Sequence, residues 1–223
     1  MKELNIVIPY ITSGLELKYC LRSIEKHHPG SEVVIIGDKP QGFKIWHIPA
    51  TDTPGLIFKE RNIFNKTLIA ADLFPEFLFM NDDHFLLEPI TENYYEGTVK
   101  EWLDRSQANS YQQTLRNTFE AIGDEPYFDI HCPIRMESKI VKKMAFCNWD
   151  KEFGYCFKSW YAHFAQITGT EYPDLKFREP MTKWNIKSLL IGRKFFSTGN
   201  RAMNNDMVKA LEELYPTKCK YEM

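Results

Sequence analysis

Short apolar runs alternate with segments of helical periodicity over the first ninety residues. Residues 5–10, 33–36 and 45–48 are apolar runs bounded by turn-prone sequence, which predicts strands. Apolar residues recur at helical spacing in 16–27, which ends before a Pro-Gly pair, and again in 59–73. Both of these segments are therefore predicted to be helices.

One more predicted strand completes this pattern. Residues 77–80 form a run of large apolar side chains after Pro75, as in a strand buried on both faces. Strand and helix alternation with crossovers of this length predicts a mostly parallel central sheet flanked by helices. The fold class is therefore expected to be α/β.

The second half of the chain has a weaker pattern. We expect part of 91–110 to be helical, 111–119 to be a short helix or an antiparallel strand, 128–133 to be a strand stopped by proline, 136–146, 156–168 and 205–215 to be helices, and 188–196 to hold a strand. There is no repeat and no low-complexity segment. We therefore expect a single domain over 1–223 with two halves, 1–90 and 91–223.

The composition is that of an ordinary soluble globular protein, with 43% hydrophobic and 26% charged residues. Aromatic residues make up 14%, which suits either a ligand cleft with stacking surfaces or a Phe-rich core. The formal net charge of −2 provides no bulk attraction to phosphate backbones. Nucleic acid is therefore not the expected partner, although a local basic patch would reopen the question.

The cysteines and the amino terminus bear on the cellular compartment. The five cysteines are odd in number, form no C-x-x-C pair and match no zinc module. Free thiols in a reducing cytoplasm are expected. The amino terminus lacks the features of a signal peptide, and no apolar stretch reaches the roughly 20 residues of a spanning helix. We expect a cytoplasmic protein with no membrane span.

The most informative chemistry follows the run at 77–80, where Asn81, Asp82, Asp83 and His84 stand together. Ligands of open α/β sheets bind at the carboxyl ends of strands. Adjacent carboxylates repel each other, and a divalent cation relieves that repulsion. We expect Asp83 and Asp82 to bind a metal, with Asn81 or Asp82 at a ribose or a metal-bound water. A turn or a helix cap is the alternative, and His84 is expected on the opposite face.

Several short motifs resemble those of GT-A glycosyltransferases. Residues 5–10 resemble the opening strand, whose end, Pro9 and Tyr10 here, approaches the base and ribose of the nucleotide. Leu21-Arg22-Ser23-Ile24 resembles the helix that follows, 33–38 resembles the second strand with its acid, and Gly55 with Arg61-Asn62 is similar to the segment before the metal strand. Asn81-Asp82-Asp83 stands where those enzymes place their D-x-D acids.

This resemblance implies a GT-A-like, Rossmann-type nucleotide-diphosphosugar transferase fold. It also implies a UDP- or GDP-type sugar donor, Mn²⁺ or Mg²⁺, and a glycan or other hydroxyl acceptor. Arg61 is a candidate for the diphosphate because guanidinium binds it with a bidentate fork; a surface arginine is the alternative. Asn62 would hold the backbone or the ribose, and Asp38 the base or ribose unless it is a turn residue. Lys59 and Lys66 are expected in solvent.

A second resemblance is to the Stealth family of sugar-phosphate transferases. Residues 17–29 follow its "LRYSLRSIEKY.PW" segment, 77–85 follow "FLYFNDDMF", and His131-Cys132-Pro133 matches a later "H.P". The chain is short for that family and lacks its "YTWVDGSD" stretch. His131 would complete the metal coordination, or would be structural.

An inverting transfer also needs a carboxylate that accepts the acceptor proton. Asp150 is our candidate, in a loop that mixes Trp, Gly and acids, although a helix N-cap explains it as simply. Three functions follow from the sequence. The first is metal-dependent glycosyl transfer, the second is Stealth-like transfer of a hexose 1-phosphate, and the third is a nucleotide- or glycan-binding module without catalysis.

Overall fold

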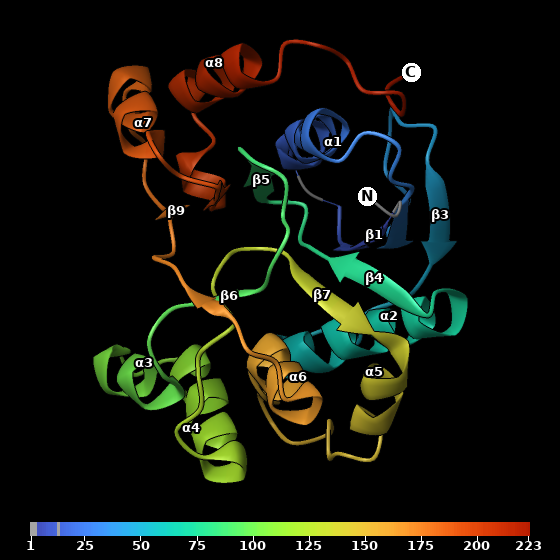
Figure 1. Ribbon diagram of the computed structural model, residues 1–223, viewed down its shortest axis with the longest axis vertical. Coiled ribbons are helices and arrows are strands. Elements are labelled where there is room, and N and C mark those ends of the chain that lie inside the picture. The colour runs from blue at the N-terminus through green and yellow to red at the C-terminus, as the bar shows by residue number, and fades with distance from the viewer. Residues whose placement is uncertain (1–3, 13) are drawn as a thin grey trace.

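The computed structural model describes residues 4–12 and 14–223, and its centre is a five-stranded sheet (Figure 1). The strand order is β3-β2-β1-β4-β7, and only β7 runs antiparallel to its neighbour. The strands are β1 (Asn5–Tyr10), β2 (Val33–Gly37), β3 (Trp46–Pro49), β4 (Glu76–Phe79) and β7 (Ile134–Glu137). The mostly parallel sheet of an α/β protein is thus confirmed.

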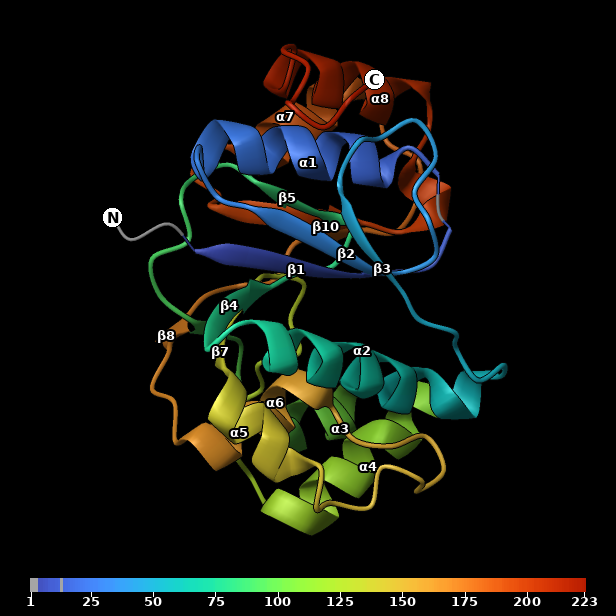
Figure 2. The same cartoon turned by 90° about the vertical axis from the view of Figure 1, so that its right-hand side faces the viewer.

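Helices cover both faces of this sheet. Figure 2 shows α1 (Glu16–His27) on one side, and α2 (Lys59–Leu73), α5 (Ser138–Met144) and α6 (Phe157–Ala165) on the other. The predicted helices 16–27 and 59–73 are confirmed at both ends. Helix α1 forms because its apolar residues share one stripe, and all of these are buried: Leu17, Cys20, Leu21 and Ile24.

A smaller sheet joins distant parts of the chain. Its order is β5-β10-β9, and its strands are β5 (His84–Leu86), β9 (Lys176–Phe177) and β10 (Phe195–Thr198). The first of these comes before residue 90 and the other two come from the last quarter of the chain. The sheet therefore crosses the expected division of the chain near residue 90.

The remaining elements surround these two sheets. They are η1 (Leu56–Phe58), β6 (Tyr94–Tyr95), α3 (Val99–Arg105), α4 (Ser110–Ile122), β8 (Thr170–Glu171), α7 (Lys183–Leu190), η2 (Asn200–Ala202) and α8 (Asn205–Leu214). Among the described residues, every helix is too short or too polar to cross a bilayer. All five cysteines are free thiols, as expected.

Several expectations for the second half need correction. Residues 128–133 form no strand, because Pro133 offers no N–H to a ladder and Asp129 caps α6 instead. The strand of this region is β7, which begins at Ile134, directly after the expected segment ends. The helix expected over 136–146 is shorter, because Met136 and Glu137 pair with β4. Residues 111–119 are helical within α4, and the strand expected in 188–196 begins only at Phe195.

Candidate functional site

A large cleft lies where the parallel strands end. Strands β1, β2 and β4 place Pro9, Asp38 and Asn81 at one edge of the sheet, and all three line a cleft of about 1370 Å³. The chain continues from β1 to β2 on one side and reaches β4 on the other, so the cleft lies at a switch in strand order. Such a switch is where open α/β sheets bind ligands. We call this space the main cleft.

A tight turn presents the two predicted acids to the main cleft. Met80 extends the pairing of β4 by donating its N–H to the carbonyl of Val7, over 3.1 Å. The turn closes where the His84 N–H donates to the Asn81 carbonyl, and Thr198 donates to the carbonyl of Asp83. Asp82 and Asp83 both line the cleft from this turn. The sequence suggested either a ligand site or a turn at this position, and the structure shows a turn whose two acids line the cleft.

The carboxylate of Asp83 is held on one side only. Its Oδ2 accepts a hydrogen bond from Lys176 Nζ at 3.0 Å. Its Oδ1 is buried and has no hydrogen-bond partner among the described residues, and His84 Nε2 lies 3.7 Å away. A buried carboxylate oxygen without a partner is costly, so this atom is available to a cation or a donor group.

His84 lies beside Asp83, and the prediction that it faces away was wrong. Its side chain is fully buried, and Nδ1 accepts the N–H of Asn81. Burial, with Lys158 and His131 nearby, holds the pKa of His84 well below its usual range. The neutral ring therefore carries its proton on Nε2, which is 3.7 Å from Asp83 Oδ1 and makes no hydrogen bond among the described residues. His84 thus offers no lone pair to a metal.

In His131, the Nδ1 atom is bound to a carboxylate, so the tautomer is the opposite of that in His84. Its Nδ1 lies 2.6 Å from Asp174 Oδ2, and the Asp174 Oδ1 accepts the His131 backbone N–H. Burial lowers the pKa of His131, although the hydrogen bond to Asp174 opposes this shift. The neutral ring then donates Nδ1–H to Asp174, while Nε2 has no hydrogen-bond partner in the described part of the chain. A carboxylate behind a histidine is the usual support of a metal-ligating imidazole.

Asp83 and His131 both line the main cleft, and the Asp83 carboxylate is close enough to oppose the lowering of the His131 pKa by burial. A carboxylate oxygen and a neutral imidazole are suitable ligands for Mn²⁺. Within residues 4–12 and 14–223, no three His, Cys, Asp or Glu side chains form a ready-made metal cluster. A metal bound by Asp83 and His131 would need further ligands from its substrate and would compete with Lys176 for the Asp83 carboxylate.

Most of the predicted nucleotide-contacting residues line the main cleft, whereas Tyr10 and Arg61 do not. Asp38 accepts hydrogen bonds from both the N–H and the hydroxyl of Thr12, which lower the pKa of Asp38. Asn62 holds Thr53 through two hydrogen bonds of 3.0 and 2.8 Å, so its amide fixes the loop before α2. The side chain of Tyr10 is buried in the core, and its carbonyl faces Lys66.

Lys66 is buried, and the prediction that it lies in solvent was wrong. Its Nζ donates to Asp52 Oδ2 at 2.9 Å and to the Tyr10 carbonyl at 3.2 Å. Lys66 projects from α2 toward the ends of β1 and β2 and lines the main cleft, with only 5% of its side chain exposed. Lys59 is 62% exposed, in agreement with expectation.

Arg61 and Asp150 bind each other instead of facing the main cleft. Arg61 Nη1 lies 2.8 Å from Asp150 Oδ1, and the Asp150 side chain is 75% exposed. Neither residue lines the main cleft or the smaller cavity described next. The catalytic role of Asp150 and the diphosphate contact of Arg61 stay predictions from the sequence, and their mutual ion pair is the simpler interpretation.

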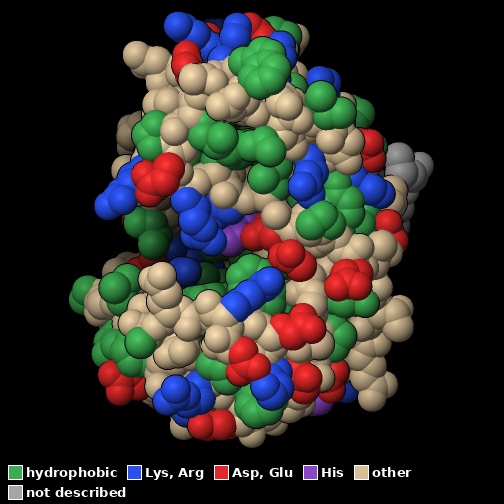
Figure 3. Space-filling model, turned by 90° about the vertical axis from the view of Figure 1, so that its left-hand side faces the viewer, with side chains coloured by type: hydrophobic (Ala, Val, Ile, Leu, Met, Phe, Trp, Pro, Cys, Tyr) green, Lys and Arg blue, Asp and Glu red, His purple; other side chains and the backbone are tan. Residues whose placement is uncertain are grey.

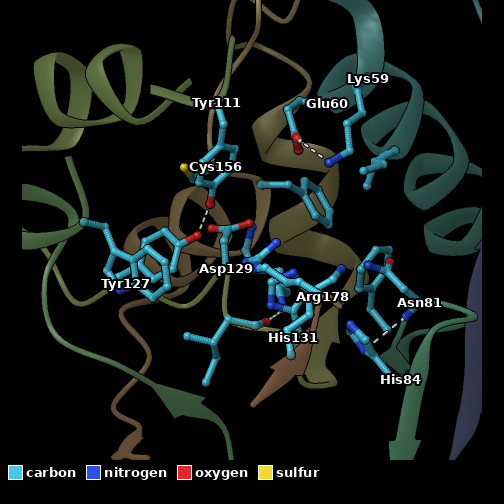
Figure 4. Close-up of a pocket in the computed structure, with 17 residues that line it drawn as sticks. Lys59, Glu60, Asn81, His84, Tyr111, Tyr127, Asp129, His131, Cys156 and Arg178 are labelled. Carbon is cyan, nitrogen blue, oxygen red and sulfur yellow. Dashed lines mark hydrogen bonds and ion pairs between the residues drawn. The ribbon is translucent and has the colours of Figure 1, made fainter. Parts of the chain in front are cut away.

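A smaller cavity of about 330 Å³ opens beside the main cleft, and we call it the side pocket (Figure 4). It shares Lys59, Asn81, His131 and Lys176 with the main cleft. Its other walls combine aromatic and charged side chains, among them Glu60, Trp102, Tyr111, Tyr127, Asp129 and Arg178. Figure 3 shows basic, acidic and histidine side chains gathered around a hollow on this side of the molecule.

The sequence interpretation missed the residues that come from the last third of the chain. Lys176 contacts Asp83, Asp174 supports His131, and Arg178 lines the side pocket. Residues 174–178 carry no motif and were not singled out. One signal was available, since Lys176 and Arg178 flank the apolar Phe177, an alternation typical of a strand with one buried face.

Comparison with solved structures finds the galactosyltransferase LgtC, solved in complex with donor and acceptor sugar analogues. The match has a TM-score of 0.51 at 14% sequence identity and covers 96% of each chain. It shows that this chain has the α/β fold of a glycosyltransferase over its whole length. No family model and no curated protein matches the chain, so the similarity to the Stealth family stays a prediction from motifs.

Proposed function

We propose that this protein is a metal-dependent glycosyltransferase that moves a sugar from a UDP- or GDP-type donor to a hydroxyl acceptor. One observation carries the proposal: Asp83, with a buried oxygen that lacks a partner, shares the main cleft with the Asp174-supported His131. This pair lies at the switch in strand order of a glycosyltransferase fold.

Each part of the site then has a chemical task. Asp83 and His131 would hold Mn²⁺ or Mg²⁺, which would neutralise the diphosphate as it leaves. Lys59 and Lys176, at the junction of the two cavities, place positive charge beside the same group. The bond between the anomeric carbon and the diphosphate breaks, and the acceptor oxygen forms the new bond. The acceptor proton passes to a base or to the released diphosphate.

The two cavities divide donor and acceptor in this proposal. The main cleft holds the nucleotide near Pro9, Asp38 and Asn81. The side pocket holds the acceptor, because it meets the main cleft beside His131 and its aromatic walls suit the apolar face of a sugar ring.

The proposal is tested by incubating the protein with UDP- and GDP-sugars, with and without Mn²⁺, and identifying the nucleotide released. We expect metal-dependent release of a nucleoside diphosphate, at first by slow hydrolysis in which water is the acceptor. Release of a nucleoside monophosphate would instead indicate phosphosugar transfer. Binding without any release at any metal concentration would leave only the binding module.

The Asp83→Ala variant should lose this turnover by at least about a hundredfold, because it removes the carboxylate at the leaving group. A matched control is Asp72→Ala, since Asp72 is a 73%-exposed carboxylate bound to Lys142 away from both cavities. Asp72→Ala should retain full activity. Full activity of Asp83→Ala would overturn the assignment.

A further inference from the structure

The side pocket contains more positive charge than its own carboxylates neutralise. Basic side chains outnumber acidic ones in its wall, where Lys59, Lys158, Lys176 and Arg178 stand against Glu60 and Asp129. The formal charge of the whole chain is −2, so this local excess is not a property of the protein at large. Two of these four cations already have carboxylate partners, since Lys176 binds Asp83 at 3.0 Å and Lys59 lies 3.7 Å from Glu60. The partners of the other charged groups show how much of the excess is available to a ligand.

The carboxylate of Asp129 is already committed to helix α6. Its Oδ1 accepts the backbone N–H of Lys158 at 3.0 Å, and its Oδ2 accepts the N–H and the hydroxyl of Ser159 at 2.8 and 2.6 Å. The positive end of a helix offsets such a charge. Burial also raises the pKa of Glu60 to about 7, so part of that carboxyl is neutral near pH 7.

Lys158 is a buried cation without a carboxylate partner in the described structure. Its ammonium donates to the carbonyls of Ile130 and Cys132, the second over 2.9 Å. Carbonyl oxygens orient the ammonium but carry no net negative charge. Lys158 lines the side pocket, where the carboxylates of Asp174 and Glu60 also lie within reach of its charge.

Arg178 is the group best placed to bind an anion. No hydrogen bond or ion pair involves its guanidinium anywhere in residues 4–12 and 14–223. The neighbouring acid, Glu179, is bound by Arg201 at 3.3 Å instead. Arg178 directly follows β9 and is exposed to solvent, and both Arg178 and Lys176 line the side pocket. Figure 4 shows Arg178 close to His131.

The donor diphosphate does not account for Arg178. Lys59 and Lys176 line both cavities, so these two residues lie within reach of a diphosphate in the main cleft. Arg178 and Lys158 line the side pocket alone. A second anion, separate from the diphosphate, matches this distribution of charge.

We propose that the side pocket selects an acceptor sugar that carries a carboxylate or a phosphate, with Arg178 as the residue that binds this anionic group. Trp102 and Tyr127, which stack on each other with ring centroids 4.5 Å apart, belong to the wall of this pocket. Guanidinium binds either oxyanion with two parallel hydrogen bonds. This inference rests on the proposed glycosyl transfer and specifies its acceptor class.

The test uses the intact protein, its donor and Mn²⁺, with acceptors in matched pairs. p-Nitrophenyl glucuronide is compared with p-nitrophenyl glucoside, and glucose 6-phosphate with glucose. Nucleoside diphosphate release is measured for each compound, and direct binding is measured by calorimetry. The first pair reports on a carboxylate and the second on a phosphate.

We expect the anionic member of at least one pair to be used or bound about tenfold better than its neutral partner, the usual effect of a hydrogen-bonded charge. Arg178→Ala should lose this preference by raising KM for the anionic acceptor, and Arg178→Lys should restore part of it. Arg116→Ala is the matched control, since Arg116 is exposed on α4 and lines neither cavity. It should keep the preference.

Equal or better use of the neutral compounds would overturn the inference, as would a preference that survives Arg178→Ala. Failure of every anionic compound to be used or bound would overturn it as well. Donor hydrolysis without acceptor separates these results from failure of the proposed function. An enzyme that hydrolyses its donor yet ignores the anionic group keeps its function and loses only this acceptor class.

Discussion

At the scale of single residues, Gly37 shows how closely the end of β2 approaches the main cleft. Its φ is +136°, and a Cβ at this position would lie 1.9 Å from the Tyr10 carbonyl oxygen. A side chain here would push β1 and β2 apart where Pro9 and Asp38 line the cleft. The sequence offered Gly37 only as the residue before an acid, while the structure shows why no larger residue fits.

Gly37→Ala should destabilise the fold by about 3 kcal/mol or more, because it combines a backbone clash with an unfavourable φ. Gly42→Ala provides the control, since Gly42 also has a positive φ of +81° but has no atom within 4 Å of the added Cβ. That change should cost only about 1 kcal/mol. Urea unfolding of both variants checks the difference, and equal losses would contradict the steric argument.

Glu60 gives a second prediction at this scale. Burial raises the pKa of its carboxyl from 4.5 to about 7; Lys59 and Lys158 oppose the shift, and Asp129 adds to it. The folded state therefore binds an extra proton between about pH 4.5 and 7, and stability falls as the pH rises through this window.

Glu60→Gln removes the ionisation and should stabilise the fold at pH 8 by up to about 3 kcal/mol relative to the unchanged protein. At pH 5 the two proteins should have nearly equal free energies of unfolding. Chemical denaturation at both pH values measures the change. A difference that does not vary with pH would refute the buried-carboxyl explanation.

At the scale of elements, hydrogen bonds join the C-terminal segment to helix α1. Arg22 of α1 donates to both oxygens of Glu222, at 2.6 and 2.8 Å, and to the Tyr215 carbonyl after α8. The side chains of Arg22 and Glu222 are almost fully buried. Arg22 stands in the Leu-Arg-Ser-Ile segment whose resemblance to glycosyltransferases was noted, and here it holds the C-terminal segment.

The hydrogen bonds from Arg22 lower the pKa of Glu222 from 4.5 to about 2. The stabilisation is therefore complete above about pH 4.5 and is lost as the pH falls through 2. Glu222→Gln should cost about 2 to 3 kcal/mol at pH 7 and progressively less below pH 4.5. Unfolding followed from pH 7 to pH 3 checks this dependence.

Glu213→Gln is the control for this prediction. Glu213 binds Lys183 and Lys187, but its ion pairs are exposed to solvent, which screens them. Glu213→Gln should therefore lower the free energy of unfolding far less than Glu222→Gln. A similar loss from Glu213→Gln would show that the Arg22 contact is not special.

The success of sequence interpretation also differs between elements. Helices α1 and α2 were predicted with correct ends, because twelve or more residues of periodic pattern define each of them. The segment 128–133 was misassigned, because its apolar residues serve the core without pairing in a ladder. Whether a short apolar run becomes a strand depends on a partner, which for β7 is β4, more than fifty residues away.

At the scale of the whole molecule, the two cavities meet where the N-terminal strands and the last third of the chain face each other. A ligand that binds only the folded state stabilises it by about 2.7 kcal/mol at a hundredfold excess over Kd, and so raises the melting temperature. We therefore expect UDP or GDP to raise the melting temperature only when Mn²⁺ is present. Asp83→Ala should remove that shift, whereas a metal-independent shift would separate nucleotide binding from the metal.

The sequence by itself determined the parallel α/β sheet, the turn of Asp82 and Asp83, and the expectation of a site there. These features follow from local periodicity and from the rule that strand ends carry ligands, and both are written in neighbouring residues. It also suggested His131 through a short motif.

Only the tertiary structure decided which groups face that turn. Lys176 binds Asp83 across 93 residues of sequence, and Asp174 supports His131 across 43. In the folded chain Arg61 and Asp150 pair with each other, and neither lines the main cleft. Contacts between distant residues depend on strand order and on the packing of loops, which no local pattern encodes. The chemistry of the turn was therefore legible from the sequence, and its partners were not.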